Sequence, residues 1–346
     1  MKKQFQIVGI VWIVLSVFML VSAVGAADKS VIEWKFQDTY GSNSGPGKYL
    51  NVPFAKWIEE VSNGRIKVTR YEPGALASVN DTYDALSRGG AFDVAALYPG
   101  FYTGIMPEGN VEQGLPWGWS DAKAHTISLF KFGLLDIMKK VYAKHNLHLL
   151  AHYPMGDVYN IGTVKPVNKL EDLKGMKIRA VGAYAEYVKA LGASPVSVPY
   201  GEIYMALKMG TIDGYLASAG ALVSNKLGEV VHHYLLPTTN SIGFVVAVNQ
   251  DSWNALPDDL KNVLEICGPQ AAVEIAANYS GTVENSMAIA RDKFGVQFHT
   301  LSLEDQQKAI KLALPIWDEI GAKSPESKEA VDAIKNTLRY LGRIQE

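Results

Sequence analysis

The sequence contains very little cysteine and no excess of charge of either sign. Cys267 is the only cysteine among 346 residues, which excludes an intramolecular disulfide and any zinc or iron–sulfur site built from clustered cysteines. Lys and Arg number 33 and Asp and Glu number 35, so the formal net charge is −2. Nonspecific binding to nucleic acid needs a basic surface, and no local basic stripe is visible. We therefore expect no nucleic-acid partner.

Catalytic and metal-binding motifs are also missing. Gly45 to Lys48 looks like part of a phosphate-binding loop, but Ser42 stands where that motif needs a glycine and Tyr49 where it needs Ser or Thr. The sequence has no His-Glu-x-x-His and no Gly-x-Ser-x-Gly segment. We predict no catalytic residue, no metal site and no cofactor.

Residues 1–27 differ in composition from the rest of the chain. Two lysines precede an apolar run from Ile7 to Val21, and small residues follow through Ala27. The run is shorter than the ~20 residues that a membrane-spanning helix needs. This layout is typical of a cleavable signal peptide with cleavage near Ala26 or Ala27, and an uncleaved membrane anchor is the alternative. We expect an exported, periplasmic protein.

After residue 27 the hydrophobic pattern alternates between period two and period 3.6, which predicts strands alternating with helices and hence an α/β fold. Apolar residues alternate with charged ones over Ile32–Phe36, and Phe244–Val248 reads as a fully buried strand. We predict single helices over Asp121–Tyr142 and Gln270–Arg291, and helical structure in the last ~40 residues. Two similar β-α-β runs indicate two α/β units.

The second of these units carries a resemblance to a known family. It contains Gly-Met-Lys-Ile-Arg at residues 175–179, Gly-Ala-Ser-Pro-Val at 192–196, and Pro-Tyr-Gly-Glu-Ile-Tyr-Met-Ala-Leu-Lys-Met-Gly-Thr-Ile-Asp-Gly at 199–214. This ordered block resembles the solute-binding proteins of the tripartite ATP-independent periplasmic (TRAP) transporters, of the DctP type. Segments 58–66 and 247–257 resemble the same family. The resemblance thus spans nearly all of the chain after the signal peptide.

The resemblance implies an α/β fold of two lobes, similar to periplasmic binding proteins, with a long helix that joins or braces the lobes. We assign residues 28–156 plus 245–284 to lobe I. Residues 157–244 plus 285–346, with the C-terminal helices, are assigned to lobe II. The implied function is capture of a small organic carboxylate between the lobes and delivery to the membrane subunits of a TRAP transporter, by a monomer that is not an enzyme. A secreted α/β enzyme acting on a small carboxylate and a binding protein of an ATP-driven importer are the alternatives.

Arg179 is the first candidate for a ligand-binding residue. It ends an expected parallel strand, and ligands of open α/β sheets lie beyond the carboxyl ends of strands. A guanidinium can hold a carboxylate through two parallel hydrogen bonds, which a lysine cannot reproduce. The resemblance places Arg179 at the family's carboxylate-binding arginine.

The other candidates are aromatic residues in segments expected to face the cleft. Sialate-binding relatives have a second arginine at the position that matches Tyr159, so a second cation is missing there. The Glu-Trp pair that relatives using a metal ion place near the Asp-Gly pair is also missing after Gly214. A site with one cation and apolar walls favours a monocarboxylate. The predicted aromatic ligand-binding residues are Tyr40, Tyr98, Phe101, Trp117, Tyr159, Tyr200 and Tyr215.

Overall fold

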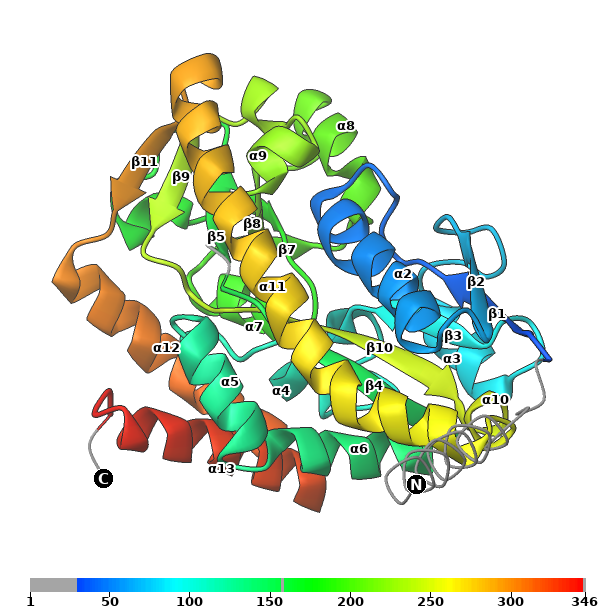
Figure 1. Cartoon of the computed structure of the whole chain (residues 1–346). Coiled ribbons are helices and arrows are strands. Elements are labelled where there is room, and N and C mark those ends of the chain that lie inside the picture. The colour runs from blue at the N-terminus through cyan, green and yellow to red at the C-terminus, as the bar shows by residue number, and fades with distance from the viewer. Residues whose placement is uncertain (1–29, 157–158, 345–346) are drawn as a thin grey trace, which may run out of the picture.

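The first of two β-sheets is assembled from distant parts of the chain. The computed structural model describes residues 30–156 and 159–344. The first sheet consists of β1 (Ile32–Gln37), β2 (Ile66–Tyr71), β3 (Val94–Leu97), β4 (Leu147–Pro154) and β10 (Gly243–Asn249). Their order is β2-β1-β3-β10-β4, with β1 parallel to both of its neighbours and β10 antiparallel to β3 and β4 (Figure 1). Every residue of β3 and β10 is buried, which explains their uninterrupted apolar sequences.

The second sheet is built mainly from the chain between β4 and β10. It consists of β5 (Tyr159–Thr163), β6 (Lys177–Arg179), β7 (Ser194–Val196), β8 (Gly214–Ser218), β9 (His233–Leu236) and β11 (Gln297–Thr300). The order is β11-β9-β5-β8-β6-β7. β6 is parallel to β7 and β8, whereas β5 is antiparallel to β8 and β9. The predicted two-lobed α/β fold is therefore confirmed, with one sheet in each lobe.

Helices and short helical turns cover the sheets. Those that precede β4 are η1 (Gly47–Asn51), α2 (Val52–Val61), α3 (Thr82–Arg88), η2 (Pro99–Phe101), α4 (Gly109–Glu112), α5 (Ala122–Phe130) and α6 (Leu134–Lys144). Those between β5 and β9 are η3 (Leu170–Leu173), α7 (Ala183–Ala190), η4 (Tyr200–Glu202), α8 (Ile203–Lys208), α9 (Ala221–Ser224) and η5 (Leu227–Glu229). The chain then forms α10 (Gln250–Asn254), α11 (Asp258–Phe294), α12 (Leu303–Gly321) and α13 (Pro325–Tyr340).

The single helix predicted over Asp121–Tyr142 is wrong, because the structure has two helices there. The side chain of Asp121 accepts a hydrogen bond of 2.8 Å from the backbone N–H of Ala124 and so caps α5. α5 ends at Phe130, and Gly133 has φ 73° before α6 begins. Glycine adopts this left-handed conformation without the steric cost that a Cβ would add, so Gly133 permits the break.

The long helix α11 spans both lobes. It packs against β4 and α2 of the first lobe and against α9 and η5 of the second, and it crosses the molecule diagonally in Figure 1. It is longer than the predicted Gln270–Arg291 and contains Pro269. The predicted helix that joins or braces the lobes is confirmed.

The chain also passes between the lobes on either side of the second sheet. It leaves the first sheet after β4 and returns through residues 237–242, called here the return segment, to begin β10. At the C-terminal end α12 packs against α7 and α13, while α13 packs against α5 and α6 of the first lobe.

The predicted bounds of the two lobes stay a prediction. They group residues 285–346 with lobe II, whereas α13, within that range, packs against helices of the first lobe. The predicted signal peptide lies outside the described residues.

Two further findings concern only residues 30–156 and 159–344. No helix in these ranges combines the length and hydropathy of a membrane-spanning segment. No three His, Cys, Asp or Glu side chains in them are grouped as the ligands of a metal ion would be.

Candidate functional site

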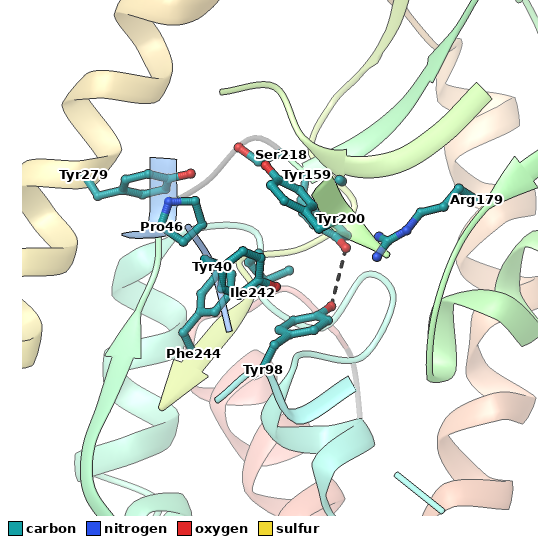
Figure 2. Close-up of a pocket in the computed structure, with 11 residues that line it drawn as sticks. Tyr40, Pro46, Tyr98, Tyr159, Arg179, Tyr200, Ser218, Ile242, Phe244 and Tyr279 are labelled. Carbon is teal, nitrogen blue, oxygen red and sulfur yellow. Dashed lines mark hydrogen bonds between the residues drawn. The ribbon is translucent and has the colours of Figure 1, made fainter. Parts of the chain in front are cut away.

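A small cavity lies between the two lobes, where the ends of strands from both sheets meet (Figure 2). Its volume is about 20 Å³, which is room for about one water molecule. Residues at or near strand ends supply much of the lining. Ligand sites of open α/β sheets usually form beyond the carboxyl ends of strands. The lining residues are Tyr40, Pro46, Tyr98, Tyr159, Arg179, Tyr200, Ala217, Ser218, Ile242, Phe244 and Tyr279.

Arg179 is the charged residue of this lining and is almost fully buried. It ends β6, is 2% exposed, and points toward the tyrosine rings in Figure 2. Its Nε donates a hydrogen bond of 2.9 Å to the backbone oxygen of Val198. Within the described part of the chain, no carboxylate forms an ion pair with this guanidinium. A positive charge is thus held out of water without a charged partner among those residues.

Neutral phenol groups surround the arginine. Burial raises the pKa of Tyr40 well above its ordinary value, although the nearby charge of Arg179 opposes that shift. Burial also raises the pKa of Tyr98, whose hydroxyl lies 3.4 Å from the hydroxyl of Tyr159. Figure 2 marks this contact, which joins the end of β3 to the start of β5. The hydroxyls of Tyr40 and Tyr98 therefore stay protonated at ordinary pH. A phenol hydroxyl can donate or accept a hydrogen bond.

Aromatic contacts close the cavity from both lobes. The ring of Tyr40 meets the ring of Tyr200 edge-on at 5.3 Å between centroids, and the ring of Phe244 at 5.2 Å. Tyr40 follows β1 in the first lobe, and Tyr200 lies on η4 in the second lobe. The Tyr40–Tyr200 contact therefore bridges the lobes.

Five of the eight predicted site residues line this cavity, and three lie elsewhere. Those in the lining are Tyr40, Tyr98, Tyr159, Arg179 and Tyr200. Phe101 lies in a neighbouring cavity described below and contacts Tyr98 edge-on. Tyr215 is fully buried beside Gly162 in the second sheet, where a Cβ on the glycine would lie 2.6 Å from the tyrosine ring. The indole of Trp117 donates a 2.8 Å hydrogen bond to the hydroxyl of Tyr187, away from the cavity.

Six lining residues were not predicted from the sequence. Ile242 and Phe244 adjoin the start of β10, and Tyr279 comes from the middle of α11. Phe244 was recognised as part of a buried strand, but nothing local indicates that its ring reaches the cavity. Ser218 ends β8 and lies close after the Asp-Gly pair at 213–214, which is the signal that could have found it. The remaining unpredicted residues are Pro46 and Ala217.

A buried carboxyl lies on α4, whose backbone closely approaches the first residue of β10. Glu112 on α4 is fully buried and accepts a 2.6 Å hydrogen bond from the hydroxyl of Tyr142. Burial raises the pKa of Glu112 to about 8. Burial also lowers the pKa of His152, on β4, to about 3. Both groups are consequently neutral near pH 7.

We expect Glu112→Gln to change how stability depends on pH. The folded-state pKa of Glu112 lies above the ordinary value of 4.5, so the unfolded state loses its proton at lower pH than the folded state. The cost to folding stability therefore grows from about pH 4.5 to about pH 8 and is constant above that. A neutral glutamine removes that cost, which amounts to about 4 kcal/mol at pH 8. Urea unfolding at pH 5 and pH 8 should show a stability advantage of the variant that is larger at pH 8.

Glu33→Gln is the matched control, because Glu33 on β1 is exposed and the charge change is the same. This control should leave the pH dependence unchanged. A Glu112→Gln advantage that is the same at both pH values would show that Glu112 is not held neutral by burial.

Comparisons with known proteins bear on the whole chain. The family model of the bacterial extracellular solute-binding proteins, family 7 (DctP), matches residues 36–324. A monocarboxylate 2-oxoacid-binding periplasmic protein of Nostoc sp. is 27% identical over 303 residues, covering 84% of this chain and 81% of the relative. The C4-dicarboxylate-binding periplasmic protein DctP of Rhodobacter capsulatus is 24% identical over 310 residues, covering 87% of this chain and 89% of the relative.

Solved structures of TRAP periplasmic solute-binding proteins have a similar fold. A TRAP periplasmic solute-binding protein of Chromohalobacter salexigens superposes with a TM-score of 0.80 at 19% identity, covering 90% of this chain and 97% of that one. The family consists of extracytoplasmic substrate-binding proteins and not of enzymes. Since the family model covers most of the chain, this protein belongs to the bacterial extracellular solute-binding proteins of family 7, the solute-binding proteins of TRAP transporters.

Proposed function

We propose that this protein captures a small monocarboxylate in the interlobe cavity, with the ligand carboxylate on Arg179. The observation that carries the proposal is the burial of this guanidinium without a carboxylate partner among the described residues. A buried, unpaired charge is costly, so a ligand carboxylate that pairs with it regains favourable interaction energy. Because Nε already bonds to Val198, the terminal nitrogens are the groups that would hold the ligand.

The charge of the cavity favours one carboxylate over two. Arg179 is the only ionised side chain among the described lining residues, and the others are apolar or carry hydroxyl groups. A second carboxylate would enter without a cation and carry a desolvation cost of several kcal/mol. The Nostoc relative is named for monocarboxylates and the Rhodobacter relative for C4-dicarboxylates, so a carboxylate is common to both names. The single cation of this cavity favours the first of these ligand classes.

Four tyrosines complete the proposed site. Tyr40, Tyr98, Tyr159 and Tyr200 would contribute apolar ring faces and hydroxyl groups around the ligand. Tyr215 and Trp117 are not part of the proposed site, because neither of them lines the cavity.

The proposed cycle is that of an exported carrier. The protein would act in the periplasm as a monomer, close around its ligand, release it chemically unchanged to the membrane subunits of a TRAP transporter, and catalyse no reaction. Genes for a small and a large membrane subunit adjacent to its own gene, with no ATPase gene, would support this partner over an ATP-driven importer.

A thermal-shift screen of the protein purified from the periplasm tests the ligand class. Monocarboxylates and dicarboxylates of matched carbon number, such as butyrate and succinate, are compared at equal concentrations. A ligand at ~100 times its dissociation constant stabilises the folded state by about 2.7 kcal/mol. We expect the largest shifts from monocarboxylates, and recovery of the ligand unchanged after incubation.

Two outcomes would contradict the proposal. Larger shifts with dicarboxylates would overturn the single-carboxylate assignment. Conversion of the ligand during incubation would favour the alternative of a secreted enzyme.

A further inference from the structure

A second cavity lies beside the first, and the two share part of their walls. The second, called here the outer cavity, has a volume of about 310 Å³, against about 20 Å³ for the cavity at Arg179. Tyr40 and Tyr200 line both cavities. The other walls of the outer cavity include Pro73, Val79, Phe101, Pro199 and Glu202.

The cavity at Arg179 is too small to hold an organic acid as it stands. Room for about one water molecule does not accommodate a carboxylate with its carbon chain, so side chains must move when a ligand binds. The rings of Tyr40 and Tyr200 separate this space from the outer cavity and come from different lobes. A small separation of the lobes therefore parts the two rings and joins the two cavities.

Tyr200 is the more exposed of the two rings. Tyr40 is 5% exposed and has aromatic neighbours on two sides, Tyr200 and Phe244. Tyr200 is only partly buried and lies on the three-residue turn η4 at the edge of the second lobe. A side chain on a short, exposed turn moves at lower cost than one packed in a core.

The walls of the outer cavity favour an apolar occupant. Pro73, Val79, Phe101 and Pro199 supply apolar surface from both lobes. The one carboxylate among its described lining residues is Glu202, and no lysine or arginine is found among them. A second carboxylate entering this space would meet negative charge, whereas a hydrocarbon chain would leave water for apolar contacts.

We propose that the ligand is a monocarboxylate with an extended apolar chain, whose carboxylate lies on Arg179 and whose chain passes between Tyr40 and Tyr200 into the outer cavity. This inference rests on the proposed function of Arg179 and adds the substrate class. It gives the outer cavity the role of a chain-binding site. It also explains why the space beside the arginine is so small, because that space has to hold only the head of the ligand.

Calorimetric titration with acetate, butyrate, hexanoate and octanoate tests the proposal on the unmodified protein. Each methylene that leaves water contributes roughly a fourfold gain in affinity, so we expect octanoate to bind at least tenfold more tightly than butyrate. Equal or weaker binding of octanoate would overturn the chain-binding role. Tight butyrate binding in that case would leave the proposed monocarboxylate function standing, so the two failures are distinguishable.

A variant that fills the outer cavity locates the effect. Val79→Trp places a large ring in the outer cavity, and Val79 does not line the cavity at Arg179. We expect the ratio of octanoate to butyrate affinity to fall at least tenfold. Val31→Trp makes the same substitution at an exposed position outside both cavities and should leave the ratio unchanged.

Val79→Phe serves if the tryptophan variant does not fold, with a smaller fall in the same direction. An unchanged affinity ratio in a folded Val79 variant would overturn the proposal, because the chain would then lie elsewhere.

Discussion

Replacing Arg179 with alanine is expected to weaken binding of the monocarboxylate ligand by roughly 30-fold or more. Truncating one partner of a buried, hydrogen-bonded charge pair typically costs about 2–5 kcal/mol. Arg179→Lys should restore only part of the affinity, because an ammonium group cannot form two parallel hydrogen bonds with a carboxylate. Isothermal titration with the strongest ligand of the thermal-shift screen measures both effects.

Stability without ligand separates a loss of binding from a loss of folding. Removing a buried guanidinium that lacks a carboxylate partner among the described residues should leave the unfolding temperature unchanged or raise it. Arg291→Ala, at an exposed position on α11, is the matched control and should alter neither property. Native affinity in a folded Arg179→Ala protein would remove this residue from the site.

Gly243→Ala is expected to destabilise the folded protein by about 3 kcal/mol, the upper end of the usual cost of adding a methyl group to a packed site. A Cβ at this position would lie 2.2 Å from the backbone oxygen of Glu112 and 2.4 Å from Nε2 of His152. Backbone cannot turn aside as a flexible side chain does, so the first residue of β10 or α4 would have to shift. Urea unfolding of the variant should show a clear fall in midpoint relative to the unmodified protein.

Gly281→Ala is the control for this substitution. Gly281 lies within α11 and a Cβ there would meet nothing within 4 Å, so alanine should stabilise slightly through its better helix propensity. Equal stabilities of the two variants would show that the backbone around Gly243 adapts at little cost.

The fold was predictable where the signal is local. Alternation over Ile32–Phe36 identified a strand, because successive side chains of a strand point to opposite faces. The apolar run Phe244–Val248 identified another, because a strand buried on both faces has an uninterrupted apolar sequence. The break at Gly133 was missed because apolar periodicity resumes on the far side of the glycine. A single glycine within a helical pattern is also compatible with an uninterrupted helix.

The site was predictable where a residue's place follows from a strand end. Arg179 was predicted in this way, together with the family resemblance, and it lines the cavity. Tyr98 and Tyr159 also line it, but they were predicted only as aromatic residues of segments expected to face the cleft. Tyr215 was predicted on the same grounds, but it lies outside the cavity even though it pairs directly with Arg179 in the sheet. Whether a residue near a strand end faces the cleft or the core depends on the register and on neighbouring side chains. Tyr279 was missed because only the complete fold brings the middle of α11 to the cavity.

The position of β10 has a consequence for the order in which the molecule can form. β10 lies between β3 and β4, yet residues 155–242 separate it from β4 in the chain. Because the chain is synthesised from its N-terminus, β3 and β4 are complete before β10, the strand that pairs with both, has been made. Until then each presents an unpaired edge, the kind of surface that promotes association between chains. The first lobe can therefore be completed only after the strands of the second lobe up to β9 have been made.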